Sequence, residues 1–214
     1  MVAALFMLAL PAHSALAKAP GGPQAPAESI AAIQPLLIGQ KVPEKLILQD
    51  IEGRPFDLNE AMGKKQTVLI FYRGGWCPYC NVQLGQLHRG EEHRNKLGYQ
   101  MSAISPDSPE ELKDTVEKHE LGYTILSDPG YKSMQAMGVS YKVTEKDFGS
   151  KRKWEQAQSR HKKAGVKGPI QLPVPSVYLV SRSGRVFFNY VNVDIRVRLS
   201  AEVLLTAAQV YAQP

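Results

Sequence analysis

Two cysteines, Cys77 and Cys80, are the only ones in the 214 residues, and Pro78 and Tyr79 separate them. The thiolate form of cysteine attacks disulfides and peroxides, and it is the lower-pKa thiol of a pair that reacts first. Two intervening residues bring the second sulfur within bonding reach of the first. An oxidised intermediate on one cysteine can therefore be resolved by the other, and the pattern predicts a dithiol that cycles to a disulfide.

Two other uses of a Cys-x-x-Cys pair have to be weighed. A zinc site needs about four ligands, and the chain has no further cysteine, while His88 and His93 are five residues apart and do not share one helical face. An inert structural disulfide is the second alternative, but so short a loop constrains the unfolded chain little. A redox role is favoured, and the sequence predicts no metal site and no cofactor.

The residues around the cysteines predict a strand that turns into a helix. Residues 67–72 (TVLIFY) are a continuous run of β-formers, typical of a strand buried on both faces. Gly74 and Gly75 end it, and Pro78 suits the first turn of a helix that continues over 81–97. The positive end of a helix stabilises a thiolate placed there. This junction strengthens the redox interpretation.

Strands and helices alternate along the rest of the chain. Helices are predicted at 109–121, where Ser108 and Glu111 form a capping box, and then at 131–137, 151–163 and 199–211. Strands are predicted at 45–49, 54–58, 67–72, 99–105, 123–126, 176–180 and 185–191. This order predicts an α/β, thioredoxin-like fold: a central mixed β-sheet flanked by helices, with an N-terminal β-hairpin and a basic helical insertion.

The positive charge is concentrated in that insertion. Lys and Arg number 26 against 20 Asp and Glu, a net charge of +6. Residues 142–167 hold nine basic and three acidic residues, so this segment carries the whole excess. The segment is either a solvated surface or a docking site for anionic partners. No aromatic residues interleave with the charges in a nucleic-acid pattern, and no nucleic-acid partner is predicted.

The N-terminus predicts export. Residues 2–10 (VAALFMLAL) are apolar, and Ala15-Leu16-Ala17 fits the small-x-small cleavage pattern of a signal peptide. The alternative is an uncleaved apolar helix, too short to span a bilayer. We therefore assign 1–17 to a signal peptide, 18–36 to a Pro- and Gly-rich linker and 37–214 to a thioredoxin-like domain. The protein is expected to be periplasmic or secreted, without stable membrane insertion.

Several ordered motifs give the chain a specific resemblance. They are 71–80 (FYRGGWCPYC), 104–106 (ISP), 126–130 (LSDPG), 172–175 (LPVP) and the turn at Gly184. With these motifs the chain resembles the peroxiredoxin-like branch of the AhpC/TSA family, within the thioredoxin superfamily, from about residue 37 to 212. The resemblance implies an antioxidant oxidoreductase that reduces hydroperoxides or protein disulfides. It also implies an external thiol reductant, thioredoxin-like or glutathione-like.

The resemblance assigns roles to the two cysteines. The attacking cysteine of peroxiredoxins falls at Cys80, whereas their threonine, proline and distant arginine fall at Cys77, Arg73 and Pro175. In thioredoxin-like proteins the first cysteine, here Cys77, is the nucleophile and Cys80 resolves. We prefer the thioredoxin-like assignment, in which Cys77 attacks. In a peroxidase of the peroxiredoxin type, Cys80 would attack and Cys77 would resolve.

Three more residues are candidates for supporting roles, each with a structural alternative. Arg73 is expected to lower a thiol pKa, or else to be a surface arginine at a strand end. Trp76 shields the sulfurs and packs a partner chain, or closes the core. Pro175 is expected opposite the dithiol with a cis peptide bond, or is an ordinary proline at a strand entrance.

One hypothesis of a different class stays open. In it the chain is a non-catalytic binding module with the thioredoxin fold. The two cysteines are locked as a disulfide, and the basic insertion docks a partner.

Overall fold

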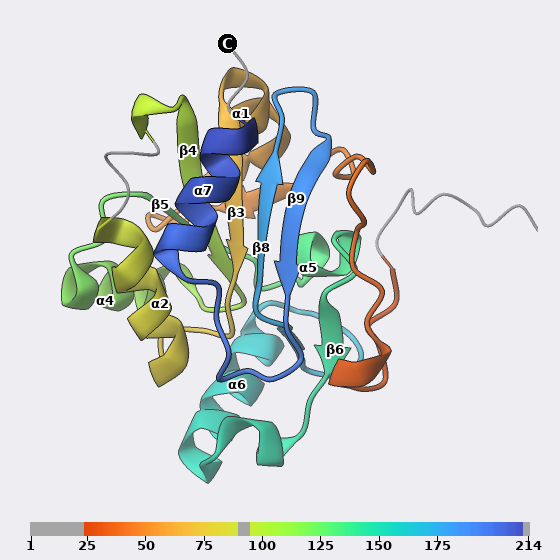
Figure 1. Cartoon of the computed structure of the whole chain (residues 1–214). Helices are drawn as coiled ribbons and strands as arrows, with labels where there is room; N and C mark the ends of the chain where they lie inside the picture. Colours follow the sequence, from red (N-terminus) through yellow and green to blue (C-terminus); the bar gives the residue numbers. More distant parts are fainter. Residues whose placement is uncertain (1–23, 90–94, 212–214) are drawn as a thin grey trace, which may run out of the picture.

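The computed structural model describes residues 24–89 and 95–211 (Figure 1). The predicted signal peptide, 1–17, lies outside the described residues. Within the described part of the chain, no helix is both long enough and apolar enough to cross a bilayer.

A seven-stranded mixed sheet forms the centre of the molecule, in the order β2-β1-β5-β4-β3-β8-β9. The three strands β3, β4 and β5 run parallel, and β8 pairs antiparallel with β3. The predicted hairpins are both present, as β1–β2 and β8–β9. The strands are β1 (Ile47–Gln49), β2 (Pro55–Asp57), β3 (Gln66–Phe71), β4 (Tyr99–Ser105), β5 (Thr124–Ser127), β8 (Ser176–Val180) and β9 (Val186–Val191).

Helices cover both faces of this sheet. Apolar residues of α2, α4 and α7 pack on one face together with both cysteines, and those of α1 and α5 pack on the other. In Figure 1, α7 crosses in front of the sheet, and α2 and α4 lie next to each other at the left. The helices are α1 (Leu58–Lys64), α2 (Pro78–Arg89), α4 (Pro109–His119), α5 (Lys132–Ala136) and α7 (Ala201–Tyr211).

The predicted basic insertion forms a separate layer beyond one end of the sheet. It contains the 3-10 helix η2 (Glu145–Phe148) and α6 (Lys151–Lys163), which has the predicted bounds. A small apolar cluster holds it together, centred on Phe148, Ala157 and Leu172. Figure 1 shows α6 beyond the end at which β3 and β9 finish. The carboxyl end of β3 also leads into the dithiol, so the insertion and the dithiol share one end of the molecule.

Some elements were not predicted. Helix α1 follows β2 directly, because the Asp57 side chain accepts a hydrogen bond from the Glu60 N–H and caps it. A second, two-stranded sheet pairs β6 (Ser140–Lys142) with β7 (Gln171–Pro173) and closes the base of the insertion. Helix α4 ends at His119 with Glu120 in the left-handed conformation, two residues before the expected Gly122.

The second half of the predicted linker packs on the molecule. Residues 24–36 include the 3-10 helix η1 (Ile30–Ala32), and Ala27 forms a β-bridge with Tyr141. Leu36 is only 1% exposed and belongs to the core on the α1 and α5 face. Pro- and Gly-rich composition predicted a flexible or extended linker. Its contacts join segments far apart in the sequence, which no local sequence pattern predicts.

Candidate active site

The dithiol lies where the sequence predicts it, between the end of β3 and the start of α2. Cys77 donates its backbone N–H to the carbonyl of Gly74 at 3.1 Å, and its own carbonyl accepts from the N–H of Asn81 at 3.1 Å. Both cysteines are free thiols. Cys77 is 1% exposed and Cys80 is fully buried. The strand-to-helix junction is confirmed, and it holds both cysteines at the start of a helix.

The two thiols have opposite pKa shifts. A hydrogen bond from the Cys80 thiol is the largest influence on Cys77, and with the Cys80 backbone and the cations of Arg198 and Arg73 it lowers the pKa of Cys77 to about 6. Burial and the neighbouring Cys77 sulfur raise the pKa of Cys80 well above its usual value. At neutral pH the proton therefore stays on Cys80, and Cys77 is the thiolate.

Arg198 is a cation in contact with both sulfurs, and no local pattern in the sequence predicts it. Its Nη2 lies 3.4 Å from the Sγ of Cys80 and 3.9 Å from the Sγ of Cys77. Its Nε and Nη1 atoms are buried and have no hydrogen-bond partner within the described residues. A buried guanidinium with unused donors beside a thiolate is suited to stabilise negative charge that develops on sulfur or oxygen.

Arg73 is buried, so it is not the surface arginine at a strand end that was the structural alternative. It is only 3% exposed, donates from Nη2 to the carbonyl of Asp147, and lies over the Trp76 ring at 5.0 Å. Its cation also lowers the pKa of Cys77, although it is the last of the influences named above. Arg73 therefore serves both the dithiol and the attachment of the insertion.

Trp76 joins the dithiol to the insertion. Its ring is 4.9 Å from the ring of Phe148, and the Lys153 ammonium lies over it at 5.4 Å. The indole packs against both the central core and the cluster of the insertion. Closing the core is thus one of its roles, and its ring also contacts Lys153 of the basic helix α6.

Pro175 differs from the expectation of a cis peptide bond. No peptide bond in the described part of the chain is cis, so that expectation is wrong. Pro175 directly precedes β8, and its carbonyl accepts a hydrogen bond from the Asn192 N–H at 3.4 Å. The alternative, a proline at the entrance to a strand, describes this position.

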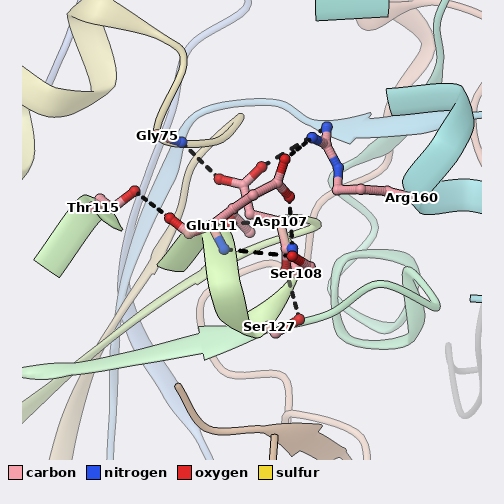
Figure 2. A network of polar contacts seen from close by, with 8 residues as sticks. Gly75, Asp107, Ser108, Glu111, Thr115, Ser127 and Arg160 are labelled. Atoms are coloured by element: carbon pink, nitrogen blue, oxygen red, sulfur yellow. Dashed lines mark hydrogen bonds and ion pairs between the residues drawn. The ribbon is translucent and has the colours of Figure 1, made fainter. Parts of the chain in front are cut away.

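A buried carboxylate supports the turn that precedes the dithiol (Figure 2). Asp107 Oδ2 accepts a hydrogen bond from the Gly75 N–H at 2.7 Å, and Asp107 is 1% exposed. Arg160 of α6 lies 3.8 Å from Asp107 Oδ1 and donates to Glu111 Oε1 at 2.7 Å. The insertion, α4 and the active-site turn therefore meet in one polar network, which the sequence analysis did not identify.

Gly75 has no room for a side chain, which gives a first prediction. A Cβ there would lie 2.1 Å from the Thr115 hydroxyl oxygen. That β-branched side chain is stiff and donates to the Glu111 carbonyl at 3.0 Å. We expect Gly75→Ala to lower the unfolding free energy by about 1–3 kcal/mol. Chemical denaturation should show a smaller loss when the same change is made in a Thr115→Ala background. Equal losses in both backgrounds would contradict this packing.

Asp107 gives a second prediction, on pH dependence. Burial is the main cause that raises its pKa to about 6, against 3.8 ordinarily. Between about pH 4 and 6 the folded state thus holds more protons than the unfolded state, and stability falls as pH rises. Asp107→Asn cannot titrate. The unfolding free energy of this variant relative to the parent should therefore increase by up to about 3 kcal/mol from pH 4 to 7, measured by denaturation at each pH. If the unfolding free energies of the two proteins change with pH in parallel, the raised pKa of Asp107 is contradicted.

Comparison with known proteins supports the family resemblance. The AhpC/TSA family model matches residues 38–188. A putative peroxiredoxin bcp of Haemophilus influenzae is 33% identical over 107 residues, covering 50% of this chain and 68% of that protein. The chloroplastic peroxiredoxin Q of Sedum lineare is 36% identical over 97 residues, covering 45% of this chain and 52% of that protein. The chain thus spans about half the length of the plant relative.

Solved structures agree on the fold. Peroxidoxin BcpB from Mycobacterium tuberculosis has a TM-score of 0.62 at 16% identity, over 81% of this chain and 97% of that one. Peroxiredoxin Q from Xanthomonas campestris has a TM-score of 0.60 at 18% identity, over 78% and 92%. These likenesses confirm the predicted thioredoxin-like fold. The peroxiredoxin relatives confirm the prediction of an oxidoreductase at the level of the family. The chain belongs to the AhpC/TSA family.

Proposed function

We propose that this chain is a thiol peroxidase in which Cys77 attacks a hydroperoxide and Cys80 resolves the product. The observation that carries the proposal is the asymmetry of the dithiol. Cys77 has a pKa lowered to about 6, first by the hydrogen bond from Cys80. The Arg198 guanidinium lies within 3.9 Å of both sulfurs. The peroxiredoxin relatives support the same chemistry.

The proposed reaction oxidises the two cysteines to a disulfide in two steps. The Cys77 thiolate attacks one oxygen of the hydroperoxide, the O–O bond breaks, and an alcohol or water leaves after taking a proton. Cys77 is then a sulfenic acid. The Cys80 thiol attacks the Cys77 sulfur and releases water, which leaves a disulfide. The dithiol has then lost two electrons, which an external thiol must return.

The peroxiredoxin relatives favour a hydroperoxide as the oxidant. With Cys77 at 1% exposure and Cys80 at none, a hydroperoxide needs to displace little of the protein to reach the sulfur. Reduction of protein disulfides is the second candidate, supported by the Cys-x-x-Cys pattern itself. A non-catalytic module with a locked disulfide would instead resist mild reductant and show no turnover.

Stopped-flow tryptophan fluorescence separates these candidates, because Trp76 is adjacent to Cys77. The reduced protein is mixed with hydrogen peroxide and, separately, with an oxidised protein disulfide. Fast oxidation by peroxide with slow exchange is the expected result. Fast exchange with slow peroxide reaction would instead establish a disulfide oxidoreductase. Inertness to both oxidants, in a protein whose thiols are titratable, would overturn an enzymatic role.

We also propose that the protein acts outside the cytoplasm, after cleavage behind Ala17. The support is the apolar segment 2–10 followed by a small-x-small site. N-terminal sequencing of the protein recovered from the periplasm or medium of an expressing cell should begin at Lys18. Recovery of the intact N-terminus in the cytoplasm would contradict export.

A further inference from the structure

The basic insertion lies beside the dithiol, which raises the question of what its charge attracts. The connection is physical: Arg73 donates to the Asp147 carbonyl, Trp76 packs on Phe148, and Lys153 lies over the Trp76 ring. The sequence places the whole net charge of +6 in 142–167, and the rest of the chain is neutral. The molecule therefore presents one charged end to a partner, at its reactive sulfurs.

The three acidic residues of the insertion, Glu145, Asp147 and Glu155, offset only part of the charge of its nine basic residues. Lys142 and Arg160 pair with acids outside the insertion. Asp147 is used in the capping box of η2, where it accepts from the Thr144 N–H at 2.8 Å. Glu155 lies 3.8 Å from Lys151, which is one exposed pair. Further basic side chains on the insertion are exposed and form no ion pair within the described residues. These are Lys146, Arg152, Lys162 and Lys167.

Exposed apolar side chains lie on the elements that flank the sulfurs. Tyr79, between the two cysteines, is 45% exposed, and Val197, next to Arg198, is 47% exposed. Apolar contacts beside a charged rim are typical of protein–protein docking surfaces. A nucleic acid or a lipid headgroup would use the charge but has no thiol to react with the pair beside it.

We infer that the basic face of the insertion, formed by the exposed basic side chains named above, docks the protein dithiol that re-reduces the enzyme, by attracting an acidic surface around that partner's own cysteines. This inference rests on the proposed function. The partner's thiolate attacks one sulfur of the Cys77–Cys80 disulfide, breaks the S–S bond and forms a mixed disulfide. The partner's second thiol then attacks the mixed disulfide. Two electrons and two protons pass to Cys77 and Cys80, and the partner leaves as a disulfide.

Charged dithiol peptides test this inference. Three synthetic peptides share a Cys-Gly-Pro-Cys centre and carry four flanking Glu, four Lys or four Ser residues. Each reduces the oxidised full-length protein, followed by tryptophan fluorescence, and dithiothreitol is the small neutral reductant. Flanking charges change the thiol pKa of the peptides, so each rate is divided by that peptide's rate with hydroxyethyl disulfide.

The expected result is a normalised rate at least about tenfold higher for the Glu peptide than for the Lys peptide at low salt. The difference should nearly vanish in 0.5 M NaCl, since screening shortens the range of the attraction. The double variant Lys146→Glu/Arg152→Glu should decrease the difference in rate between the Glu and Lys peptides at low salt. Its matched control, Lys65→Glu/Arg182→Glu, makes the same change of charge at the opposite end of β3 and β8 and should leave it intact. Rates with dithiothreitol should be equal in all three proteins.

Two results would overturn the inference. One is equal rates for the Glu and Lys peptides; if the protein then also binds phosphatidylserine vesicles, the face is assigned to a membrane surface. The other is an equal effect of the two double variants, which would indicate net charge rather than this face. Resistance of the disulfide to dithiothreitol itself would instead refute the proposed function, because no reductant could then complete the cycle.

Discussion

Replacing Cys77 with serine is expected to abolish peroxide reduction, with a loss of at least about a thousandfold in turnover. A serine hydroxyl is not ionised at neutral pH, and the Cys80 thiol left behind is fully buried, which is the main cause that raises its pKa above the usual value. The variant should therefore neither form a sulfenic acid nor change its fluorescence with peroxide. Coupled consumption of peroxide with excess dithiothreitol measures the turnover.

Cys80→Ser is the matched control for that experiment. It keeps a hydroxyl donor next to Cys77, so the attack on peroxide should persist at a rate within about tenfold of the parent. The product should stop at the sulfenic acid of Cys77, which dimedone traps and mass spectrometry locates. If Cys77→Ser forms the sulfenic acid and Cys80→Ser does not, the roles of the two cysteines are the reverse of those proposed.

Arg198→Met is expected to have the second-largest effect, a decrease of about 10- to 100-fold in the rate of oxidation at pH 7. Two causes combine: the cation no longer lowers the pKa of Cys77, and no guanidinium remains beside the sulfurs to stabilise the charge that develops on the leaving oxygen. Stopped-flow fluorescence measured over a range of pH should show a lower rate of oxidation. The pH at which that rate reaches half of its maximum should be higher than in the parent.

Two comparisons make the test of Arg198 specific. Arg196→Met removes an arginine two residues away that pairs with Asp194 at 2.8 Å at the surface, and its rate should match the parent. The Arg198 Nε and Nη1 atoms are buried without hydrogen-bond partners, so their removal should leave the melting temperature unchanged or raise it. A lower melting temperature with an unchanged rate would assign Arg198 a purely structural role.

The dithiol and its supporting elements could be predicted because their signals are local. A continuous apolar run, two glycines and a proline predict the turn from β3 to α2 within a dozen residues. The capping box of Ser108 and Glu111 is likewise local, and the structure forms both of its hydrogen bonds. Periodicity and cap chemistry act over one or two turns, which explains why the bounds of β4 and α6 agree so closely.

The rest of the site could not be predicted, because it depends on contacts between distant segments. Arg198 is 118 residues from Cys80, and nothing in the sequence distinguishes it from Arg196. The alignment of the family motif placed the distant arginine at Pro175, which the structure shows to be an ordinary trans proline before β8. Arg160 and Asp107 meet only because α6 folds back onto the active-site turn.

The claim that Cys77 is the thiolate of the pair is tested most directly by an NMR titration of the reduced parent protein with 13Cβ-labelled cysteine. The carbon shift reports ionisation of each thiol without requiring a reagent to reach a buried sulfur, and it resolves a coupled pair residue by residue. We predict that the Cys77 carbon titrates with a midpoint near pH 6, while Cys80 remains a thiol at pH 9. Titration of Cys80 first, or of neither cysteine below pH 8, would contradict the account.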